Sequence, residues 1–396
     1  MGMRACFRVA IMAGAGFLFC GSAQALDAWR GHQKALVVLV EWNDRTPNVQ
    51  LAQSQQTFFD TTTMSLKSFF QENAHGAFDL TGDVMDWRRS NRAWSSAAGC
   101  NLDPIVSEAW RLFGSDIDVS AYDSDGNGKI DNFFIVHSGR IGSDRVGPDC
   151  TFTTSNHADF TVVFQSEGLG SVGEAIPIGF YIHEGGHGYY NLPDLYSDHY
   201  HGRYGIAMWG MMGLGAWGVR NDIGTEDLFR FPAHFEPLSK VRIGWAQPRI
   251  INQTTRQVEI AAMEDATDIV VVPLGGGINY YLEYRSDRGF SAGHLGHGLL
   301  IWKNYTLIQA DGRDDLNNGT SLGRRPLPPI SENFGDASDP FPGSLNITSY
   351  AEPSTGVRFE NIVQTNDHII LDIVITGEVR PYTLPLDQQF RAPIDL

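Results

Sequence analysis

The sequence has little cysteine, and it has no long apolar run beyond its first 25 residues. Of its 4 cysteines, only Cys100 and Cys150 lie outside that first stretch. Neither belongs to a C-x-x-C pair, which argues against a redox motif or a thiolate zinc site. No later run approaches the roughly 18 apolar residues of a membrane-spanning helix. We therefore expect no stable membrane insertion.

Positive charge is also scarce. The chain has 29 Lys and Arg against 46 Asp and Glu, a formal net charge of −17. Such a surface repels nucleic acid and anionic membranes and favours cations. The sequence has no block of like charge, so the acidity belongs to a folded surface and not to a tail. These features exclude a nucleic-acid-binding protein.

Residues 1–25 have the pattern of a signal peptide. Two arginines precede an apolar run over residues 9–20, and small residues at Ala23 and Ala25 form a cleavage site. A lipoprotein signal at Cys20 is the weaker alternative, because a bulky residue precedes it. Cleavage near Ala25 removes two arginines and no acid, which changes the formal charge from −17 to −19. We expect a protein that is secreted, extracellular or periplasmic.

Export determines the expectation for the two remaining cysteines. In an oxidising compartment, one disulfide between Cys100 and Cys150 is the simplest pairing. The alternative is two unpaired buried thiols.

The mature length exceeds one ordinary hydrophobic core and predicts two domains. Residues 26–250 contain an apolar strand (34–41), a helix (65–73), a hairpin (78–87) and a second helix (105–113). This order predicts an α/β (α+β) catalytic domain. A short helix within residues 232–245 leads out of it.

Residues 251–378 have a β pattern, with strands expected at 257–261, 268–274, 280–285, 297–303, 357–364 and 368–375. Thr365-Asn366-Asp367 is a hairpin signal between the last two. We expect an antiparallel β-sandwich here. The segment 307–348, rich in Asp, Asn, Gly and Pro, is expected to be an ordered loop or an ion-binding excursion, and residues 379–396 form a tail.

The strongest motif is His183-Glu184-Gly185-Gly186-His187. On a helix, a four-residue separation returns to nearly the same face, so both imidazoles can reach one metal ion. Glu184 lies about 100° round the helix and can act as general base without being a ligand. Each glycine costs about 1 kcal/mol in a helix interior, which predicts that something packs closely against this helix. Paired core or surface histidines are the alternative.

A second motif runs from Asp123 to Asp131. Oxygen side chains at alternate positions with a glycine at the bend match the calcium loop of an EF-hand. The twelfth position holds Phe134 instead of Glu, and a strand follows instead of a helix. We therefore predict a structural calcium loop outside an EF-hand, with these ligands: Asp123, Asp125, Asn127, Asp131 and the Lys129 carbonyl. A turn without an ion is the alternative.

Met212 lies in a glycine- and methionine-rich turn, Trp209–Trp217. A Met beneath a zinc site that does not ligate the metal is typical of the Met-turn of metzincins, and we place Met212 as the floor of the site. Methionine as a core gap-filler is the alternative.

The chain resembles the secreted immune inhibitor A-type zinc metallopeptidases. The likeness touches about two-thirds of the sequence, in order, and includes the segments Ser65–Gly76, Tyr122–Asp131, Leu192–Tyr196, Trp209–Trp217, Ser239–Trp245, Tyr280–Tyr284 and Gly298–Trp302. The resemblance implies a zinc endopeptidase with a metzincin-like catalytic domain, bound calcium and a β-rich C-terminal domain.

One departure from the family pattern lies after the second histidine. Family members often read H-E-x-G-H-x-x-G-L-P-D, whereas this chain has one more residue, and Asn191 stands where Gly would make the turn. Asn tolerates the left-handed conformation, so the turn is expected to form. We assign the third zinc ligand to Asp194, with His199, His201 and Glu226 as rivals.

Together these features predict a monomeric zinc endopeptidase that cleaves proteins or peptides with a zinc-activated water and Glu184 as general base. Tyr204 is the preferred oxyanion donor, with His201 and Tyr196 as alternatives. Two other functions remain open. One is an exported, calcium-stabilised binding or adhesion protein with a decayed peptidase site. The other is a metal-dependent hydrolase of a glycan or ester.

Overall fold

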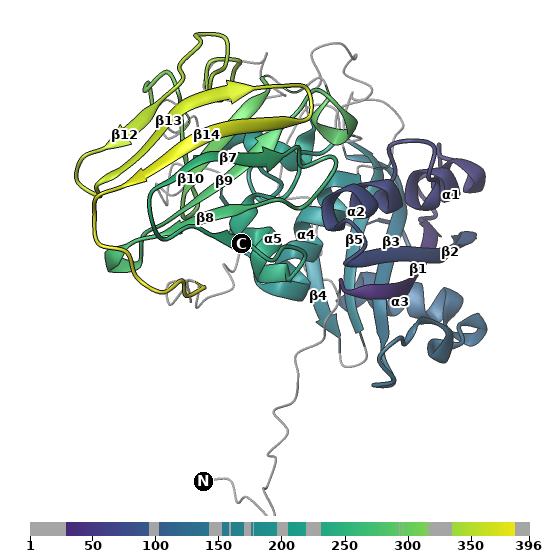
Figure 1. Cartoon of the computed structure of the whole chain (residues 1–396). Coiled ribbons are helices and arrows are strands. Elements are labelled where there is room, and N and C mark those ends of the chain that lie inside the picture. The colour runs from purple at the N-terminus through teal and green to yellow at the C-terminus, as the bar shows by residue number, and fades with distance from the viewer. Residues whose placement is uncertain are drawn as a thin grey trace, which may run out of the picture.

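A computed structural model describes most of the chain and shows a mixed α/β fold with three sheets (Figure 1). The described residues are 29–94, 103–141, 153–157, 160–169, 176, 178–195, 205–218, 231–292, 294, 296–314, 316 and 335–384. Within them, no helix has the length and apolar character needed to cross a membrane.

The first sheet has the strand order β2-β1-β3-β5-β4. Strand β1 pairs in parallel with β2 and β3, β3 pairs in parallel with β5, and β4 is an antiparallel edge strand. The strands are β1 Gly31–Glu41, β2 Phe78–Arg89, β3 Ile130–Ile141, β4 Thr153–His157 and β5 Phe160–Leu169. The expected strand over 34–41 is thus β1, in the middle of a largely parallel sheet.

Strand β1 is apolar and buried from Ala35 to Val40 because both faces of this part are covered. Its odd-numbered residues, such as Val37, pack with the helices α1, α2 and α4, whereas its even-numbered residues, such as Val38, pack with α3. The helices are α1 Leu51–Phe59, α2 Leu66–Ala74, α3 Asp103–Phe113, α4 Ile178–Tyr190 and α5 Pro237–Ile243. Helix α4 therefore lies on the same face of the sheet as α1 and α2.

The predicted hairpin over residues 78–87 is wrong. This segment is one continuous strand, β2, which runs parallel to β1 without a turn. Gly82 is present because the chain passes close to its neighbours: a Cβ there would lie 2.3 Å from Phe59 Cζ and 2.5 Å from the Ala35 carbonyl oxygen. Gly82 thus serves close approach of neighbouring chains and makes no turn.

Both predicted helices of this region are present. Ser65 caps α2 by accepting the amide of Ser68 at 3.0 Å, and His75 ends the helix in the left-handed region at φ 42°. The second predicted helix is α3. Helix α1 and strands β2, β4 and β5 were not predicted in these forms. Short 3-10 helices occur at Gly114–Asp116, Val119–Tyr122, Ala207–Trp209, Leu214–Trp217, Gly275–Gly277 and Gly289–Ser291.

Two sheets follow α5, with orders β11-β10-β9-β8-β6 and β12-β13-β14-β7. Their pairings are antiparallel except β6 with β8. The strands are β6 Arg249–Ile250, β7 Thr255–Ala261, β8 Val270–Pro273, β9 Asn279–Arg285, β10 Gly298–Lys303, β11 Thr306–Ile308, β12 Tyr350–Glu352, β13 Val357–Gln364 and β14 His368–Ile375. The six strands expected from the sequence are all present, and β13 and β14 form the expected hairpin.

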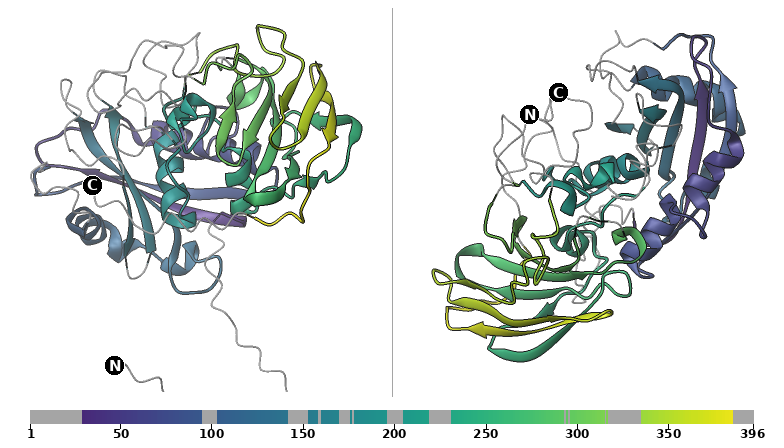
Figure 2. Two further views of the ribbon diagram at one scale, coloured as in Figure 1. Left: turned by 90° about the vertical axis from the view of Figure 1, so that its left-hand side faces the viewer. Right: turned by 90° about the horizontal axis from the view of Figure 1, so that it is seen from above.

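The two later sheets share an apolar core to which both contribute, for example through Leu282 and Phe359. Figure 2 shows them as stacked layers, with α4 between them and the first sheet. The core around α4 also takes in Tyr281 and Trp302 from the second sheet. The first residues of the expected tail pack too, since the hydroxyls of Tyr281 and Tyr382 lie 3.3 Å apart. The boundary near residue 250 stays a prediction.

Candidate metal centre

Helix α4 is buried along most of its length, and the apolar residues Ile178, Phe180 and Ile182 precede its first histidine. Its two central glycines lie against bulky neighbours. A Cβ on Gly185 would be 2.4 Å from Trp29 Cζ2, and a Cβ on Gly186 would be 2.8 Å from Met212 Sδ. The prediction of close packing against this helix is therefore confirmed.

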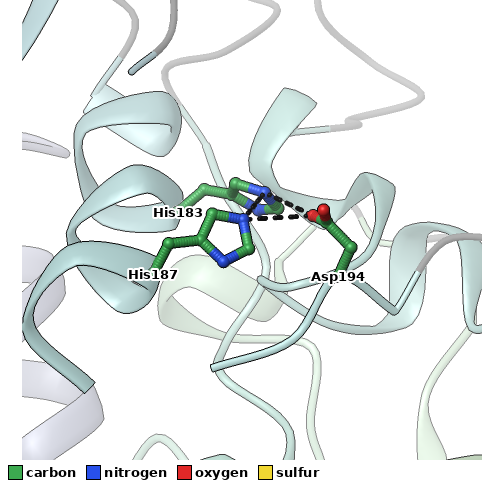
Figure 3. A group of neighbouring side chains, drawn as sticks. All are labelled: His183, His187 and Asp194. Atoms are coloured by element: carbon green, nitrogen blue, oxygen red, sulfur yellow. Dashed lines mark hydrogen bonds and ion pairs between the residues drawn. The ribbon is translucent and has the colours of Figure 1, made fainter. Parts of the chain in front are cut away.

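Three side chains converge at the end of α4 (Figure 3). His183 Nε2 and His187 Nε2 lie 3.1 Å apart, and Asp194 Oδ1 lies 3.0 Å from the first and 3.1 Å from the second. The two rings are almost perpendicular, with an interplanar angle of 87°. His183 is buried, whereas His187 and Asp194 are partly exposed. The three atoms thus form a small triangle that borders solvent.

The backbone fixes which nitrogen of each ring faces this triangle. His183 Nδ1 donates to the Met211 carbonyl at 2.9 Å, and His187 Nδ1 donates to the Leu192 carbonyl at 2.7 Å. A carbonyl oxygen can only accept, so both protons lie on Nδ1 in the neutral rings. Both Nε2 lone pairs then point at one another and at a carboxylate oxygen.

Three lone pairs so close together repel unless a proton or a metal ion lies among them. A tetrahedral zinc ion with bonds of about 2.0–2.1 Å holds its ligand atoms about 3.3 Å apart. The observed separations are near that value. The backbone hydrogen bonds behind each ring are those that orient histidine ligands in metal sites. The donor set therefore fits zinc.

The charges of the site respond to this crowding. Burial lowers the pKa of His187, but the hydrogen bond and charge of Asp194 outweigh burial and raise that pKa to about 9. Burial likewise raises the pKa of Asp194, but hydrogen bonds and charge interactions with the two imidazoles in their protonated forms outweigh it and hold that pKa far below its usual value. Asp194 is therefore ionised, as a metal ligand must be.

Asp194 reaches the site through a tight turn after α4. Asn191 has φ 50°, which confirms the expected left-handed residue, and its amide bonds the His187 carbonyl at 2.9 Å. Leu195 N donates to the Met212 carbonyl at 2.7 Å, which fixes the far side of the turn. The rival ligands His199, His201 and Glu226 lie outside the described residues.

Glu184 is half-buried beside the triangle. Burial raises its pKa. The positive charges of His183 and His187 lower this pKa, and the negative charge of Asp194 raises it further. A carboxylate with a raised pKa is better matched to proton transfer near neutral pH. The oxyanion donor Tyr204 and its alternatives Tyr196 and His201 lie outside the described residues.

Met212 is fully buried behind the metal side of α4. Its sulfur packs on Gly186, and the preceding carbonyl, of Met211, holds the His183 ring. The turn thus supports the first histidine through its backbone and the helix through its side chain. The assignment of Met212 as the floor of the zinc site stays a prediction, and nothing in the sequence pattern indicates the role of the Met211 carbonyl.

The acidic loop brings the carboxylate oxygens of Asp123, Asp125 and Asp131 within 4.8 Å of one another. Burial raises the pKa of Asp131, and the charges of the two other carboxylates add to it. Asp131 is 5% exposed, and its Oδ1 has no hydrogen-bond partner among the described residues. An orphaned buried oxygen on a carboxylate that clusters with two further carboxylates fits a bound cation.

Two other predicted ligands of this loop take part in its turn. The Asn127 side-chain oxygen accepts the Lys129 amide at 2.8 Å, while the Asn127 amide donates to Asp123 Oδ1 at 2.9 Å. Both residues are exposed. The Lys129 carbonyl stays a predicted ligand.

A third acidic group consists of Asp311, Asp336 and Asp339, within the segment expected to be an ordered loop or an ion-binding excursion. Arg313 lies 3.3 Å from Asp311 and offsets part of its charge, while Trp209 Nε1 donates to Asp339 at 2.9 Å. The first bond therefore neutralises this group in part, and the second ties it to the Met212 turn. The predicted disulfide partners Cys100 and Cys150 and the signal peptide 1–25 lie outside the described residues.

Comparison with models of known protein families gives no match, and comparison with curated protein sequences gives none either.

Proposed function

We propose that the protein is a secreted zinc-dependent endopeptidase with a metzincin-like catalytic domain, similar to the immune inhibitor A-type metallopeptidases. One observation carries this proposal: two imidazole nitrogens and one carboxylate oxygen converge within 3.1 Å, with the other nitrogen of each ring tied to a backbone carbonyl. Protein or peptide chains are the substrates, and the protein acts as a monomer.

His183, His187 and Asp194 would hold the zinc ion. Zinc bound there would lower the pKa of a water molecule towards 7 and polarise the scissile carbonyl. Glu184 is next to the first ligand in the chain and is not one of the three clustered groups, so its carboxylate would take a proton from that water. It then returns that proton to the leaving amine. Its raised pKa supports both steps.

We also propose that the loop Asp123–Asp131 holds a structural calcium ion. Its donors are all oxygen atoms, which suit a hard cation. The buried Asp131 Oδ1 without a partner supports this assignment.

The extra residue after His187 is the feature that favours the alternative of a binding protein with a decayed peptidase site. Asn191 accommodates that residue in the left-handed region, and Asp194 still reaches both imidazoles. The observed geometry therefore gives no support to decay.

The test is the variant Glu184→Ala. The proposal predicts that this variant retains stoichiometric zinc and loses hydrolysis of casein or gelatin, because it lacks the base but keeps the ligands. Hydrolysis at the wild-type rate would refute the peptidase mechanism. Zinc binding by the wild type without turnover of any protein substrate would favour the binding protein, and activity confined to glycans or esters would favour the third alternative.

A further inference from the structure

Trp29 connects three elements from its place ahead of β1. Its side chain is fully buried. Its backbone amide donates to the Tyr190 hydroxyl at 2.8 Å, at the end of α4, and its carbonyl accepts from Trp245 Nε1 at 2.7 Å. Its indole Nε1 donates to Asn132 Oδ1 at 3.1 Å, in β3. Every polar group of this residue thus has a partner on a different part of the chain.

The indole ring lies directly on the backbone of the metal helix. A Cβ at Gly185 would be 2.4 Å from Trp29 Cζ2 and 2.8 Å from Cη2. Gly185 stands between the two histidines of the candidate zinc site. Protein interiors of this density pass on small displacements instead of absorbing them. A shift of the indole therefore moves the segment that carries His183 and His187.

The same indole is tied to the end of the acidic loop. Asn132 follows Asp131 directly, is fully buried, and donates its Nδ2 to Gln33 Oε1 at 2.7 Å while it accepts from Trp29. A second contact also links the start of β3 to α4. The Tyr189 side chain, near the end of α4, bonds the backbone of Phe133 in β3. The start of β3 thus contacts α4 in two ways.

We propose that calcium binding in the loop Asp123–Asp131 is coupled to zinc binding on α4, with Trp29 as the positioning residue that transmits the coupling. The proposal rests on the zinc site proposed above. Without a cation, three close carboxylates repel, and the buried Asp131 Oδ1 has no hydrogen-bond partner in the described part of the chain. A calcium ion draws them together and fixes the start of β3. Asn132 then holds the indole against Gly185 in the arrangement that aligns the two histidines.

The coupling is measured on the full mature chain as two affinities. Zinc affinity is determined by competition with a zinc-selective chromophoric chelator, with and without saturating Ca²⁺. Calcium affinity is determined by titration, with and without zinc. We expect each metal to raise the affinity of the other by about fivefold or more, and by the same factor, because linkage is reciprocal. Equal zinc affinities with and without Ca²⁺ in the wild type would overturn the proposal.

The variant Trp29→Phe tests the path. It keeps an aromatic ring on Gly185 but removes the indole N–H that binds Asn132. We expect both metals to bind and the coupling factor to fall close to one. A general loosening of the fold would weaken the binding of both metals. It would leave the coupling factor, the ratio of the zinc affinities with and without Ca²⁺, unchanged. Trp110→Phe is the matched control, because Trp110 is exposed on α3, and it should retain the full factor.

A second variant, Asn132→Ser, breaks the same link from the other side, should Trp29→Phe fail to fold. Unchanged coupling in either folded variant would overturn the role of Trp29. The two proposals fail differently. If the chain takes up no zinc at any calcium concentration, the zinc site and the coupling both fall. If zinc binds and hydrolysis depends on Glu184 but neither responds to Ca²⁺, only the coupling falls.

Discussion

The sulfur of Met212 lies so close to Gly186 that a Cβ on this glycine would be 2.8 Å from it. The contact places the side chain of the Met-rich turn directly under the helix turn between the two histidines. A Met at this point has a thioether that can fill an irregular gap without ligating the metal. Helix and turn are thus fitted to each other at the spot where the metal ligands are held.

Replacing this glycine should disturb the site although Ala favours helices. Gly186→Ala gains about 1 kcal/mol of helix propensity but forces an overpacked contact that costs about 1–3 kcal/mol. We expect a net loss of about 1 kcal/mol in the free energy of unfolding, measured by urea titration, together with weaker zinc binding. Gly275→Ala is the control, since its nearest neighbour would be 3.6 Å away. A more stable Gly186→Ala protein with full zinc affinity would contradict this packing.

Asp194 should be required for tight zinc binding. Asp194→Asn keeps the size of the side chain but removes the charge that faces both imidazoles. We expect zinc affinity to fall by more than the 10- to 100-fold typical of lost outer-shell partners, measured by chelator competition. Asp265→Asn makes the same change at a surface pair with Arg288 and should leave zinc affinity unchanged. Full affinity in Asp194→Asn would reassign the third ligand.

Calcium should stabilise the folded chain through the acidic loop. At a concentration 100 times its dissociation constant, a ligand specific to the folded state adds about 2.7 kcal/mol to the free energy of unfolding. We expect a corresponding rise in Tm on addition of Ca²⁺, measured by calorimetry, and its loss in Asp131→Asn. Magnesium, which prefers a tighter octahedral site, should act less. An equal rise in Asp131→Asn would place the effect elsewhere.

Glu352 should make stability depend on pH. It lies on β12 in one sheet and accepts a bond from Lys303 on β10 in the other at 2.7 Å. Burial raises its pKa, but the bonds from Lys303, Tyr280 and Ser354 outweigh burial and lower the pKa to about 2, from 4.5. The ionised form is therefore favoured in the folded state. Its contribution is present above pH 4.5 and is lost as the pH falls towards 2.

The measurement is the free energy of unfolding of Glu352→Gln against wild type across this pH range. Each pKa unit corresponds to about 1.4 kcal/mol, so the shift from 4.5 to about 2 corresponds to about 3.5 kcal/mol before solvent screening at this partly exposed site reduces it. We expect a deficit of about 2–3 kcal/mol at pH 7 that narrows below pH 4.5. Glu360→Gln is the matched control, because Glu360 bonds Arg358 on its own strand at a more exposed position. A deficit that does not change with pH would show that Glu352 stabilises the fold through packing and not through its charge.

Local patterns predicted the elements that carry the site. The four-residue spacing of His183 and His187 requires only helix geometry, and the left-handed residue Asn191 requires only knowledge of which side chains tolerate that conformation. The glycines of α4 correctly indicated a close neighbour. Each of these inferences depends on residues a few positions apart, where sequence and geometry are directly linked.

Contacts between distant parts of the chain were beyond such reasoning. Nothing near Gly185 in the sequence identifies Trp29 as the ring that packs on it, because 156 positions separate them. The parallel pairing of β2 with β1 is non-local in the same way, and without it the sequence favours a hairpin over residues 78–87. For the group of Asp311, Asp336 and Asp339, the composition of residues 307–348 predicts only an ordered loop or an ion-binding excursion and not which side chains meet. Tertiary packing decides such cases, and no periodicity encodes it.

The most direct test is a crystal structure of the zinc-loaded mature protein, with anomalous scattering measured on both sides of the zinc absorption edge. The account predicts one strong zinc peak about 2.0–2.1 Å from His183 Nε2, His187 Nε2 and Asp194 Oδ1, with Glu184 beside it and not bound to it. A map without zinc signal at these three side chains, or one in which the two imidazoles point apart, would contradict it.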